Sequence, residues 1–218
     1  MYGALPVVPV LVTAYLLGSV PFGLLLGKLA GVDVRKAGSG NIGATNVLRT
    51  CGTGWGIAAF VLDFLKGYGP VMICMHFSGG GTLAAVSAAV LAVLGHNFPV
   101  WLRFRGGKGV ATSAGGALAL VPLPLAAGGI AFLIMVFITR YVSLGSMTGA
   151  TVMAVTQVLV ASAPFSMPEL PKTIMVLVMF LMVMARHRAN MSRLLRGEES
   201  KIGKRKENMP NTGGQKNR

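Results

Sequence analysis

Long apolar stretches, separated by short polar segments, make up most of the chain. An α-helix rises about 1.5 Å per residue, so crossing a hydrocarbon core of roughly 30 Å takes about 20 apolar residues, and fewer where neighbouring helices shelter the ends. Seven stretches meet this requirement: residues 5–26, 55–77, 83–98, 110–121, 125–139, 144–163 and 172–186. The pattern predicts an all-α, polytopic transmembrane helix bundle of about seven spans.

The division between the fourth and fifth stretches rests on Pro122 and Pro124. Proline has no amide hydrogen and crowds the preceding turn, so we expect two short spans joined by a hairpin. One long kinked helix, giving six spans in all, is the alternative. Seven spans with the N-terminus outside place 18 of the 20 lysines and arginines on the cytoplasmic side or in its loops, whereas six spans divide these cations between the two sides. Because basic loops favour the cytoplasm, we expect seven spans with a cytoplasmic C-terminus.

Composition and charge support this assignment. With 53% hydrophobic and 12% charged residues, the chain has too little polar surface for an ordinary soluble domain. Basic loops that meet anionic lipid headgroups account for the formal charge of +14, so we expect membrane lipid and no nucleic acid as a partner. The first basic residue is Lys28, which favours a retained first span over a cleavable signal peptide. We expect one integral-membrane domain over residues 1–199 and a basic, disordered tail over residues 200–218.

The first polar segment, residues 38–49, is rich in glycine and in short polar side chains. Glycine permits turns with positive φ and leaves backbone amides accessible, so such a loop can wrap an anion. Serine and asparagine are also common helix caps, and a capped turn is an equally good interpretation of this segment alone. Its candidate substrate-binding residues are Ser39, Gly40, Asn41, Gly43, Thr45, Asn46 and Arg49.

The second polar segment, residues 95–112, contains Gly106, Gly107, Lys108 and Gly109 directly before a predicted helix. Free amides at a helix N-terminus, the positive end of the helix dipole and a lysine charge together suit a phosphate group. The spacing is not that of a P-loop, so no nucleotide is implied. His96 either binds substrate or makes a structural hydrogen bond at a helix end, and the sequence leaves both open.

The third polar segment, residues 187–199, follows the last apolar stretch. On a continuing helix His187 and Asn190 share one face, because they are three residues apart, and can address one ligand. Histidine titrates near neutral pH, so both acid–base work and anion binding are open to it. A polar helix end at the membrane interface is the alternative. Arg193 and Glu199 complete the candidates in this segment.

Asp63 and Lys66 lie inside the second apolar stretch. Ionisable groups at this depth are costly and normally pair or line a polar cavity, and a spacing of three residues lets them meet on one helix face. We expect an ion pair that supports the site from beneath, with Lys66 reaching toward the inner surface. A transport pathway would use such residues too.

Several familiar catalytic arrangements are missing from the sequence. It contains neither the His-x4-Asp acyltransferase signature nor a Gly-x-Ser-x-Gly nucleophile elbow. The three histidines fall on different loops with few carboxylates nearby, so we expect no metal site and no cofactor. Cys51 and Cys74 fall near opposite membrane faces and are not expected to pair.

The three polar segments resemble, in order and spacing, the motifs of the bacterial acyl-phosphate:glycerol-3-phosphate acyltransferase family. The stretches that carry the resemblance are SGNIGATN, GHNFPVWLRFRGGKGVAT and HRANMSRLLRGEE, and it extends over about residues 5–199. Met191 stands where isoleucine is expected. The resemblance implies an inner-membrane enzyme, with its active site facing the cytoplasm, that moves a fatty acyl group from acyl phosphate to the 1-hydroxyl of glycerol 3-phosphate. The products would be lysophosphatidic acid and inorganic phosphate, early in phospholipid synthesis.

The resemblance also suggests roles for individual residues. Lys108, with the amides of Gly106, Gly107 and Gly109, would bind the acyl-phosphate group, and Arg49 would neutralise negative charge nearby. Glycerol 3-phosphate would be held, and its hydroxyl aimed, by Ser39, Asn41, Thr45, Asn46, His187 and Asn190, with Arg193 and Glu199 in support. We expect Ser39, Lys108, His187 and Asn190 to be catalytic. Acyl phosphate is already activated, so no acyl-enzyme is expected, and either His187 or the substrate's own phosphate can take the hydroxyl proton.

A transporter of a phosphorylated metabolite is the alternative from a different functional class. It would distribute polar residues through several spans, whereas here they gather on one predicted face. A structural membrane scaffold would leave the three polar segments without a role. We assign no oligomeric state.

Overall fold

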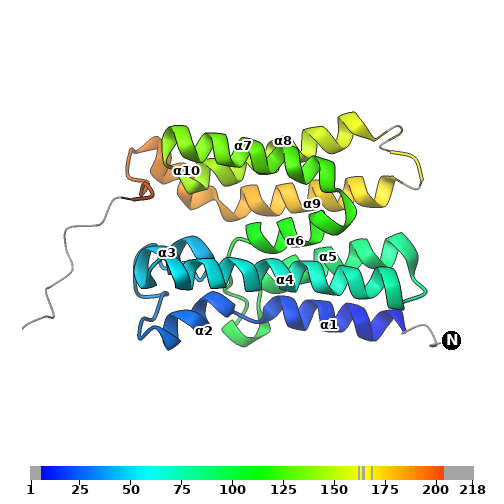
Figure 1. Cartoon of the computed structure of the whole chain (residues 1–218), viewed down its shortest axis with the longest axis horizontal. Coiled ribbons are helices and arrows are strands. Elements are labelled where there is room, and N and C mark those ends of the chain that lie inside the picture. Colours follow the sequence, from blue (N-terminus) through cyan, green and yellow to red (C-terminus); the bar gives the residue numbers. More distant parts are fainter. Residues whose placement is uncertain (1–5, 162, 164, 168, 204–218) are drawn as a thin grey trace, which may run out of the picture.

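The structure, a computed structural model, describes residues 6–161, 163, 165–167 and 169–203. The long helices of this part of the chain run side by side along the long axis of the molecule (Figure 1). The helices are α1 Val7–Ser19, α2 Phe22–Leu29, α3 Ala44–Cys51, α4 Thr53–Phe77, α5 Gly81–Asn97, η1 Val100–Leu102, α6 Val110–Leu120, α7 Pro122–Thr139, α8 Val142–Val160, α9 Leu170–Arg186 and α10 Arg188–Leu195. This arrangement confirms the predicted all-α bundle.

The described chain contains five helical segments that are long and apolar enough to cross a membrane. α9 and α10, bent by 51° at their junction, bring the number to six if they count as one span. α6 is apolar but has only 11 residues. Large hydrophobic side chains cover the outside of the bundle, among them Phe137, which is 88% exposed. The five segments are Val7–Leu29, Thr53–Phe77, Gly81–Leu102, Pro122–Thr139 and Val142–Val160.

Pro21 interrupts the first apolar stretch, which we had expected to form one helix over residues 5–26. α1 ends at Ser19 and α2 begins at Phe22, because Pro21 has no N–H group to continue the helical hydrogen bonds. The carbonyl of Val20 accepts hydrogen bonds from the Phe22 N–H at 3.1 Å and from the Lys66 ammonium at 2.8 Å. The break therefore gives a polar partner to a charged group inside the bundle.

Pro122 divides the fourth and fifth apolar stretches, as the sequence predicted. α6 ends at Leu120, and Val121 has a non-helical φ of −142°. Pro122 is the first residue of α7, a position where the N–H group would have no acceptor within the helix, so its absence costs nothing. The structure therefore has two helices here and not one kinked helix.

Small residues let the helices of the bundle approach closely. α5 is packed against α1, α4, α6 and α9, and five of its alanines are buried: Ala84, Ala85, Ala88, Ala89 and Ala92. On α4, a Cβ at Gly67 would collide with the backbone carbonyl of Thr112 in the first turn of α6. Such contacts are typical of membrane bundles, where lipid provides little hydrophobic drive for helix association.

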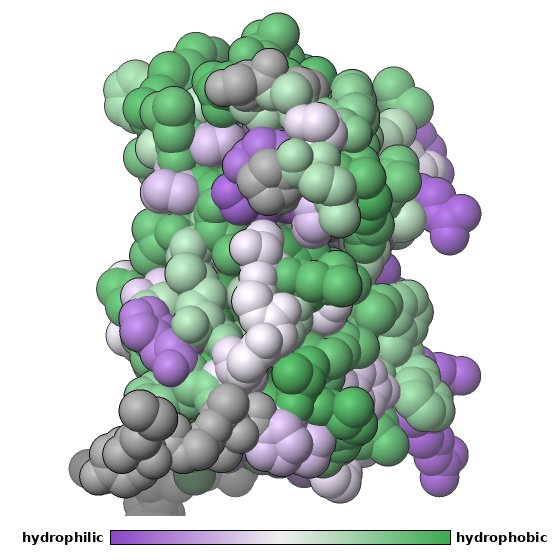
Figure 2. Space-filling model, turned by 90° about the vertical axis from the view of Figure 1, so that its right-hand side faces the viewer, coloured by the Kyte–Doolittle hydropathy of each residue, from purple (hydrophilic) through white to green (hydrophobic). Residues whose placement is uncertain are grey.

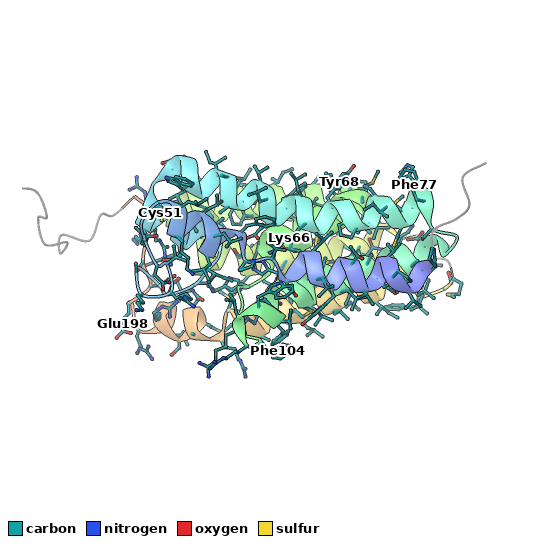
Figure 3. All side chains as sticks on the ribbon, turned by 90° about the horizontal axis from the view of Figure 1, so that it is seen from below. Cys51, Lys66, Tyr68, Phe77, Phe104 and Glu198 are labelled. Atoms are coloured by element: carbon teal, nitrogen blue, oxygen red, sulfur yellow. The ribbon has the colours of Figure 1, made fainter. Side chains whose placement is uncertain are left out.

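One half of the bundle, which we call the polar end, holds the three polar segments, and the second of them reaches the middle of the molecule, where Phe104 lies (Figure 3). The α2–α3 connection, α3, the turn between α7 and α8, and α10 gather at the left of Figure 1. At the opposite end, hydrophobic residues surround a strip of near-neutral and hydrophilic ones (Figure 2). Cys51 lies at the polar end and Phe77, three residues after Cys74, at the opposite end (Figure 3). Both cysteines are free, which confirms that they do not pair.

Candidate active site

Asn46, in the first turn of α3, organises the loop that precedes this helix. Its Nδ2 donates to the carbonyls of Val34 (2.9 Å), Ala37 (3.1 Å) and Asn41 (2.8 Å), and its Oδ1 accepts from the Ser39 N–H at 2.8 Å. The side chain is 2% exposed, and its polar atoms are all hydrogen-bonded to the backbone of the loop. We expected Asn46 to hold substrate. It instead fixes the position of Ser39.

The same loop presents several of the predicted residues at the surface. Ser39 and Gly40 are exposed, and the Ser39 hydroxyl bonds to no other group of the described chain. Gly40 has a φ of 71°, which favours glycine. Asn41 Oδ1 accepts from the Gly43 N–H at 2.7 Å in a turn that leads into α3, with Thr45 half-buried in its first turn. The segment is thus an open loop with a free hydroxyl and a turn closed by Asn41, and no side chain caps α3.

The glycines before Lys108 bind protein backbone. The N–H of Gly106 donates to the carbonyl of Asn97 at 3.2 Å, and the N–H of Gly107 donates to the carbonyl of His96 at 3.1 Å. The expectation that these two amides face a phosphate was wrong. Both N–H groups donate to carbonyls at the end of α5, which have no partner within that helix. Gly109, with a φ of 76°, starts α6.

Lys108 and the third polar segment meet in a connected set of hydrogen bonds. The Lys108 ammonium donates to Asn190 Oδ1 at 2.6 Å, and Asn190 Nδ2 donates to Glu199 Oε1 at 2.6 Å. Glu199 also accepts from the Ser143 hydroxyl at 2.7 Å and from Arg193 Nε at 2.7 Å. The sequence placed Lys108, Asn190, Arg193 and Glu199 in one site, and the structure brings them together.

The protonation of this cluster follows from its burial. Burial lowers the pKa of Lys108 to about 8, so the ammonium is charged at neutral pH and loses its proton in mild alkali. Burial alone would raise the pKa of Glu199, but hydrogen bonds from Ser143, Asn190 and Arg193 outweigh it and hold that pKa below its ordinary value. The cluster therefore contains a carboxylate that is fully ionised at neutral pH.

His187 lies at the bend between α9 and α10, not within one continuous helix as we had expected. It is 2% exposed, and its Nδ1 is 2.8 Å from the carbonyl of Val183. Because a carbonyl only accepts, Nδ1 carries the proton and Nε2 has a free lone pair. Burial, helped by the positive charge of Lys108, lowers the pKa of His187 to about 4. The imidazole is neutral at physiological pH.

Arg49 connects the first polar segment with the third. Its Nη2 donates to the carbonyl of Ser200 at 2.9 Å, while its Nε is buried and has no hydrogen-bond partner in the described chain. Arg49, Lys108 and Arg193 share the electrostatic environment of one carboxylate, that of Glu199. Arg186 adds its charge to the same environment, so positive charge is in excess and favours an anionic ligand.

Asp63, Lys66 and His96 form a buried polar group beside the glycine loop. The Lys66 ammonium is 2.8 Å from Asp63 Oδ1, which confirms the predicted pair, and His96 Nδ1 is 3.6 Å from the same oxygen. Lys66 is only 6% exposed, lies midway along the bundle and does not reach toward the surface (Figure 3). His96 is 5% exposed with its ring against Gly107, where a Cβ would collide with Nε2. These contacts favour the structural role for His96 over substrate binding.

A cavity of about 440 Å³ lies where the first two polar segments meet. It is open to the surface and has a positive lining from three arginines, none of which was among the predicted site residues. Within the described residues, no group of three or more His, Cys, Asp and Glu side chains is placed to hold a metal ion. The cavity is lined by Arg35, Ser39, Gly40, Asn41, Ile42, Phe104, Arg105, Gly106 and Arg186.

Two residues of this region were missed in the sequence. Ser143 stands at the start of α8, only three residues after Arg140, the one cation of a polar connection that we had passed over. Arg186 directly precedes His187 and was counted only as a basic residue at the end of a span. Its guanidinium donates to the carbonyls of Gly106 and Gly107. Both could have been found by examining every polar residue next to a predicted helix end.

A comparison with protein families identifies the chain. A family model described as "Glycerol-3-phosphate acyltransferase" matches residues 8–197. The chain belongs to this family. A glycerol-3-phosphate acyltransferase of Mesorhizobium japonicum is 48% identical over 194 residues, covering 88% of this chain and 94% of the relative. One from Synechococcus elongatus is 45% identical over 210 residues, covering 92% and 97%.

Two crystal structures share the fold of this glycerol-3-phosphate acyltransferase. Both are of PlsY (YgiH), described as an integral membrane glycerol 3-phosphate acyltransferase. The glycerol 3-phosphate form is 37% identical with a TM-score of 0.83, covering 90% of this chain and 96% of that one. The lysophosphatidic acid form is 36% identical with a TM-score of 0.81, covering 90% and 95%. The present chain is accordingly an integral, multi-pass membrane acyltransferase, as its three polar segments indicated.

Proposed function

We propose that the chain transfers a fatty acyl group from acyl phosphate to the 1-hydroxyl of glycerol 3-phosphate. The hydroxyl oxygen attacks the acyl carbonyl carbon, a new ester bond forms, and the bond between that carbon and the phosphate oxygen breaks. The products are 1-acyl-glycerol 3-phosphate, a lysophosphatidic acid, and inorganic phosphate. Related proteins of the same fold have been crystallised in glycerol 3-phosphate and lysophosphatidic acid forms, which supports this acceptor and this product.

The observation that carries the proposal is the cluster built on Lys108, Asn190 and Glu199. It places a charged ammonium, 2.6 Å from Asn190, among three further cations, Arg49, Arg186 and Arg193, with a single carboxylate. Cations held in place before the substrate arrives stabilise the charge that develops on a departing phosphate. Lys108 and Arg49 bind the acyl-phosphate group in this scheme, and Ser39 with the cavity beside it holds glycerol 3-phosphate. Both substrates then meet at the polar end.

The proton of the attacking hydroxyl goes to the departing phosphate. A neutral His187 with a pKa of about 4 is a weak base, whereas the phosphate oxygen that leaves the acyl carbon keeps the electron pair of the broken bond and becomes the more basic group. The phosphate is therefore the better final acceptor. The free lone pair on His187 Nε2 accepts a hydrogen bond from the hydroxyl and orients it toward the carbonyl carbon. No acyl-enzyme forms, because acyl phosphate already carries a good leaving group.

The same proposal includes the topology. α6 counts as a short seventh span, the N-terminus lies outside, and the polar end faces the cytoplasm of a bacterial cell at its inner membrane. The distribution of Lys and Arg supports this orientation, since 18 of 20 belong to segments on that side. Residues 1–199 act as the catalytic domain. Of the tail, Ser200 contacts Arg49 and the N–H of Ile202 donates to the carbonyl of Arg140 at 2.8 Å, while residues 204–218 lie outside the described part.

Purified protein in mixed micelles tests the reaction. Palmitoyl phosphate and glycerol 3-phosphate are supplied together and separately, and both lysophosphatidic acid and phosphate are measured. We expect equal amounts of the two products, formed only when both substrates are present. Palmitoyl-CoA offered in place of palmitoyl phosphate should give little product. Phosphate release without glycerol 3-phosphate, or efficient transfer from the thioester alone, would contradict the proposal.

A further inference from the structure

Arg186, the last residue of α9, makes two hydrogen bonds to the glycine loop. Its Nε donates to the carbonyl of Gly107 at 2.9 Å and its Nη2 donates to the carbonyl of Gly106 at 2.7 Å. The guanidinium also lies over the ring of Phe98, 5.7 Å from its centroid. Two N–H groups of one planar fork therefore hold two consecutive peptides.

The other side of the same peptides is held by the end of α5. The N–H groups of Gly106 and Gly107 donate to the carbonyls of Asn97 and His96. Gly107 also lies so close to the His96 ring that no side chain would fit there. All four polar groups of these two residues are thus bonded to protein, which leaves the loop little freedom to move.

The residues next to these contacts are those that meet the substrate in the proposed reaction. Lys108 follows Gly107, and His187 follows Arg186, with Asn190 one turn further. The hydrogen bond between Lys108 and Asn190 joins the end of the loop to α10, which follows α9 directly. A shift of the loop along α9 would move the ammonium away from its partner.

We propose that Arg186 is a positioning residue, which fixes the glycine loop on the end of α9 and so sets Lys108 against His187 and Asn190 for binding acyl phosphate. This inference rests on the proposed function. The planar guanidinium is suited to the task, because it presents a rigid fork of donors. Lysine at position 186 would keep the positive charge, but its single ammonium could not hold both carbonyls in the same geometry. The Arg186→Lys variant therefore separates the effect of positioning from the effect of charge.

The experiment compares Arg186→Lys with Arg188→Lys. Arg188 is the matched control: it lies two residues away, is exposed, and makes one long contact of 3.3 Å to the carbonyl of Ala185. We expect kcat/KM for palmitoyl phosphate to fall roughly ten- to hundredfold in Arg186→Lys, the effect of losing a hydrogen bond from a charged group. Arg186 also lines the cavity assigned to glycerol 3-phosphate, but lysine keeps the charge there, so KM for glycerol 3-phosphate should change less than kcat/KM for palmitoyl phosphate does. Arg188→Lys should behave as the wild type does.

Hydrogen–deuterium exchange of the same proteins measures the loop directly and without any substrate. We expect the peptide that contains residues 104–109 to exchange faster in Arg186→Lys than in Arg188→Lys, with α4 and α8 unchanged. Wild-type kinetic parameters together with unchanged exchange in Arg186→Lys would overturn the inference. Equal losses in every kinetic parameter, faster exchange throughout the bundle, or a variant that does not fold would also overturn it, because each shows a general structural role.

The two proposals fail in different ways. If wild-type protein forms no product from palmitoyl phosphate, the proposed function is wrong, while the exchange measurement still reports whether Arg186 holds the loop. If the wild type is active and the exchange of residues 104–109 does not change, the positioning role is wrong and the proposed function stands.

Discussion

Lys108 is the residue on which the proposed chemistry depends most. Its ammonium donates directly to Asn190, and the hydrogen bonds of Gly106 and Gly107 fix the chain before it. Replacing it with alanine should lower kcat/KM by about a thousandfold or more, because removing one stabilising group at a reacting oxyanion costs this much. Lys36→Ala, an exposed change at the polar end, should retain activity. Turnover in micelles together with the amount of inserted protein checks the prediction, and near-normal activity of Lys108→Ala would contradict it.

The lowered pKa of Lys108 predicts how activity depends on pH. Burial lowers the pKa to about 8, so the charged form predominates below that pH and is lost as the pH rises through it. We expect kcat/KM for acyl phosphate to fall tenfold per pH unit above about 8. Lys108→Arg should have lower activity but no such decline up to pH 10, because arginine stays protonated. A wild-type profile that is flat to pH 10 would show that this charge is not required.

Asn46 contributes stability rather than chemistry. Alanine at this position would leave the Val34 carbonyl without a partner in a buried environment, and the Ala37 carbonyl and the Ser39 N–H without partners in a partly buried one. We expect the free energy of unfolding to fall by about 2–4 kcal/mol. Thr50→Ala, on the same helix, loses a hydroxyl bond to the carbonyl of Asn46 and a weak contact to Cys51 Sγ, and should cost less than about 1 kcal/mol. Unfolding midpoints in detergent compare the two variants, and equal midpoints would argue against the role given to Asn46.

At the residue level, the sequence identified the polar segments but not which groups their side chains and amides hydrogen-bond to. Lys108, Asn190 and Glu199 could be grouped because glycine, lysine and amide side chains beside helix ends suit phosphate. Asn46 and His96 could not be separated from ligand-binding residues, because the same side chains also satisfy backbone groups of buried loops. Only the tertiary structure shows that the amides of Gly106 and Gly107 donate to carbonyls at the end of α5.

At the level of helices, hydropathy and proline positions predicted most of the fold. The seven apolar stretches correspond to helices with ends a few residues away, and Pro122 marks the start of α7. The break at Pro21 was missed because the residues on both sides are apolar, so hydropathy does not change there. The bend at His187 was missed for a related reason, since a polar segment that follows a helix can continue it in the same direction or turn.

Gly67 tests how closely α4 and α6 must pack. A Cβ at this position would collide with the carbonyl of Thr112, in the first turn of α6 and four residues after Lys108. Gly67→Ala should separate the two helices, lower the free energy of unfolding by about 1–3 kcal/mol and reduce activity through the displaced loop. Gly69→Ala is the control on the same helix, because its Cβ would meet open space and a helical alanine is favoured by up to about 1 kcal/mol. Equal stability of the two variants, measured in detergent, would contradict this account.

At the scale of the whole molecule, helices of opposite direction bring three distant polar segments to one end. Residues 38–49, 104–109 and 187–200 are joined there by hydrogen bonds such as the one from Arg49 to Ser200. The arrangement leaves the lipid-facing sides apolar and concentrates charge where water and phosphate compounds are available. It also means that the active site requires all three segments on the same side of the membrane.

Cysteine labelling provides the test of that requirement. In a background with Cys51 and Cys74 replaced by serine and alanine, single cysteines are placed at the exposed positions Lys36, Arg105 and Arg188, with Ser166 at the opposite end. The cation distribution predicts that the first three positions are shielded from an impermeant maleimide in intact spheroplasts and react in inverted vesicles, whereas position 166 shows the reverse. Each should be labelled almost completely from one side. If any of the first three positions is labelled from the same side as position 166, the three segments cannot form one cytoplasmic site, since no helix-end contact can extend across a bilayer of about 30 Å.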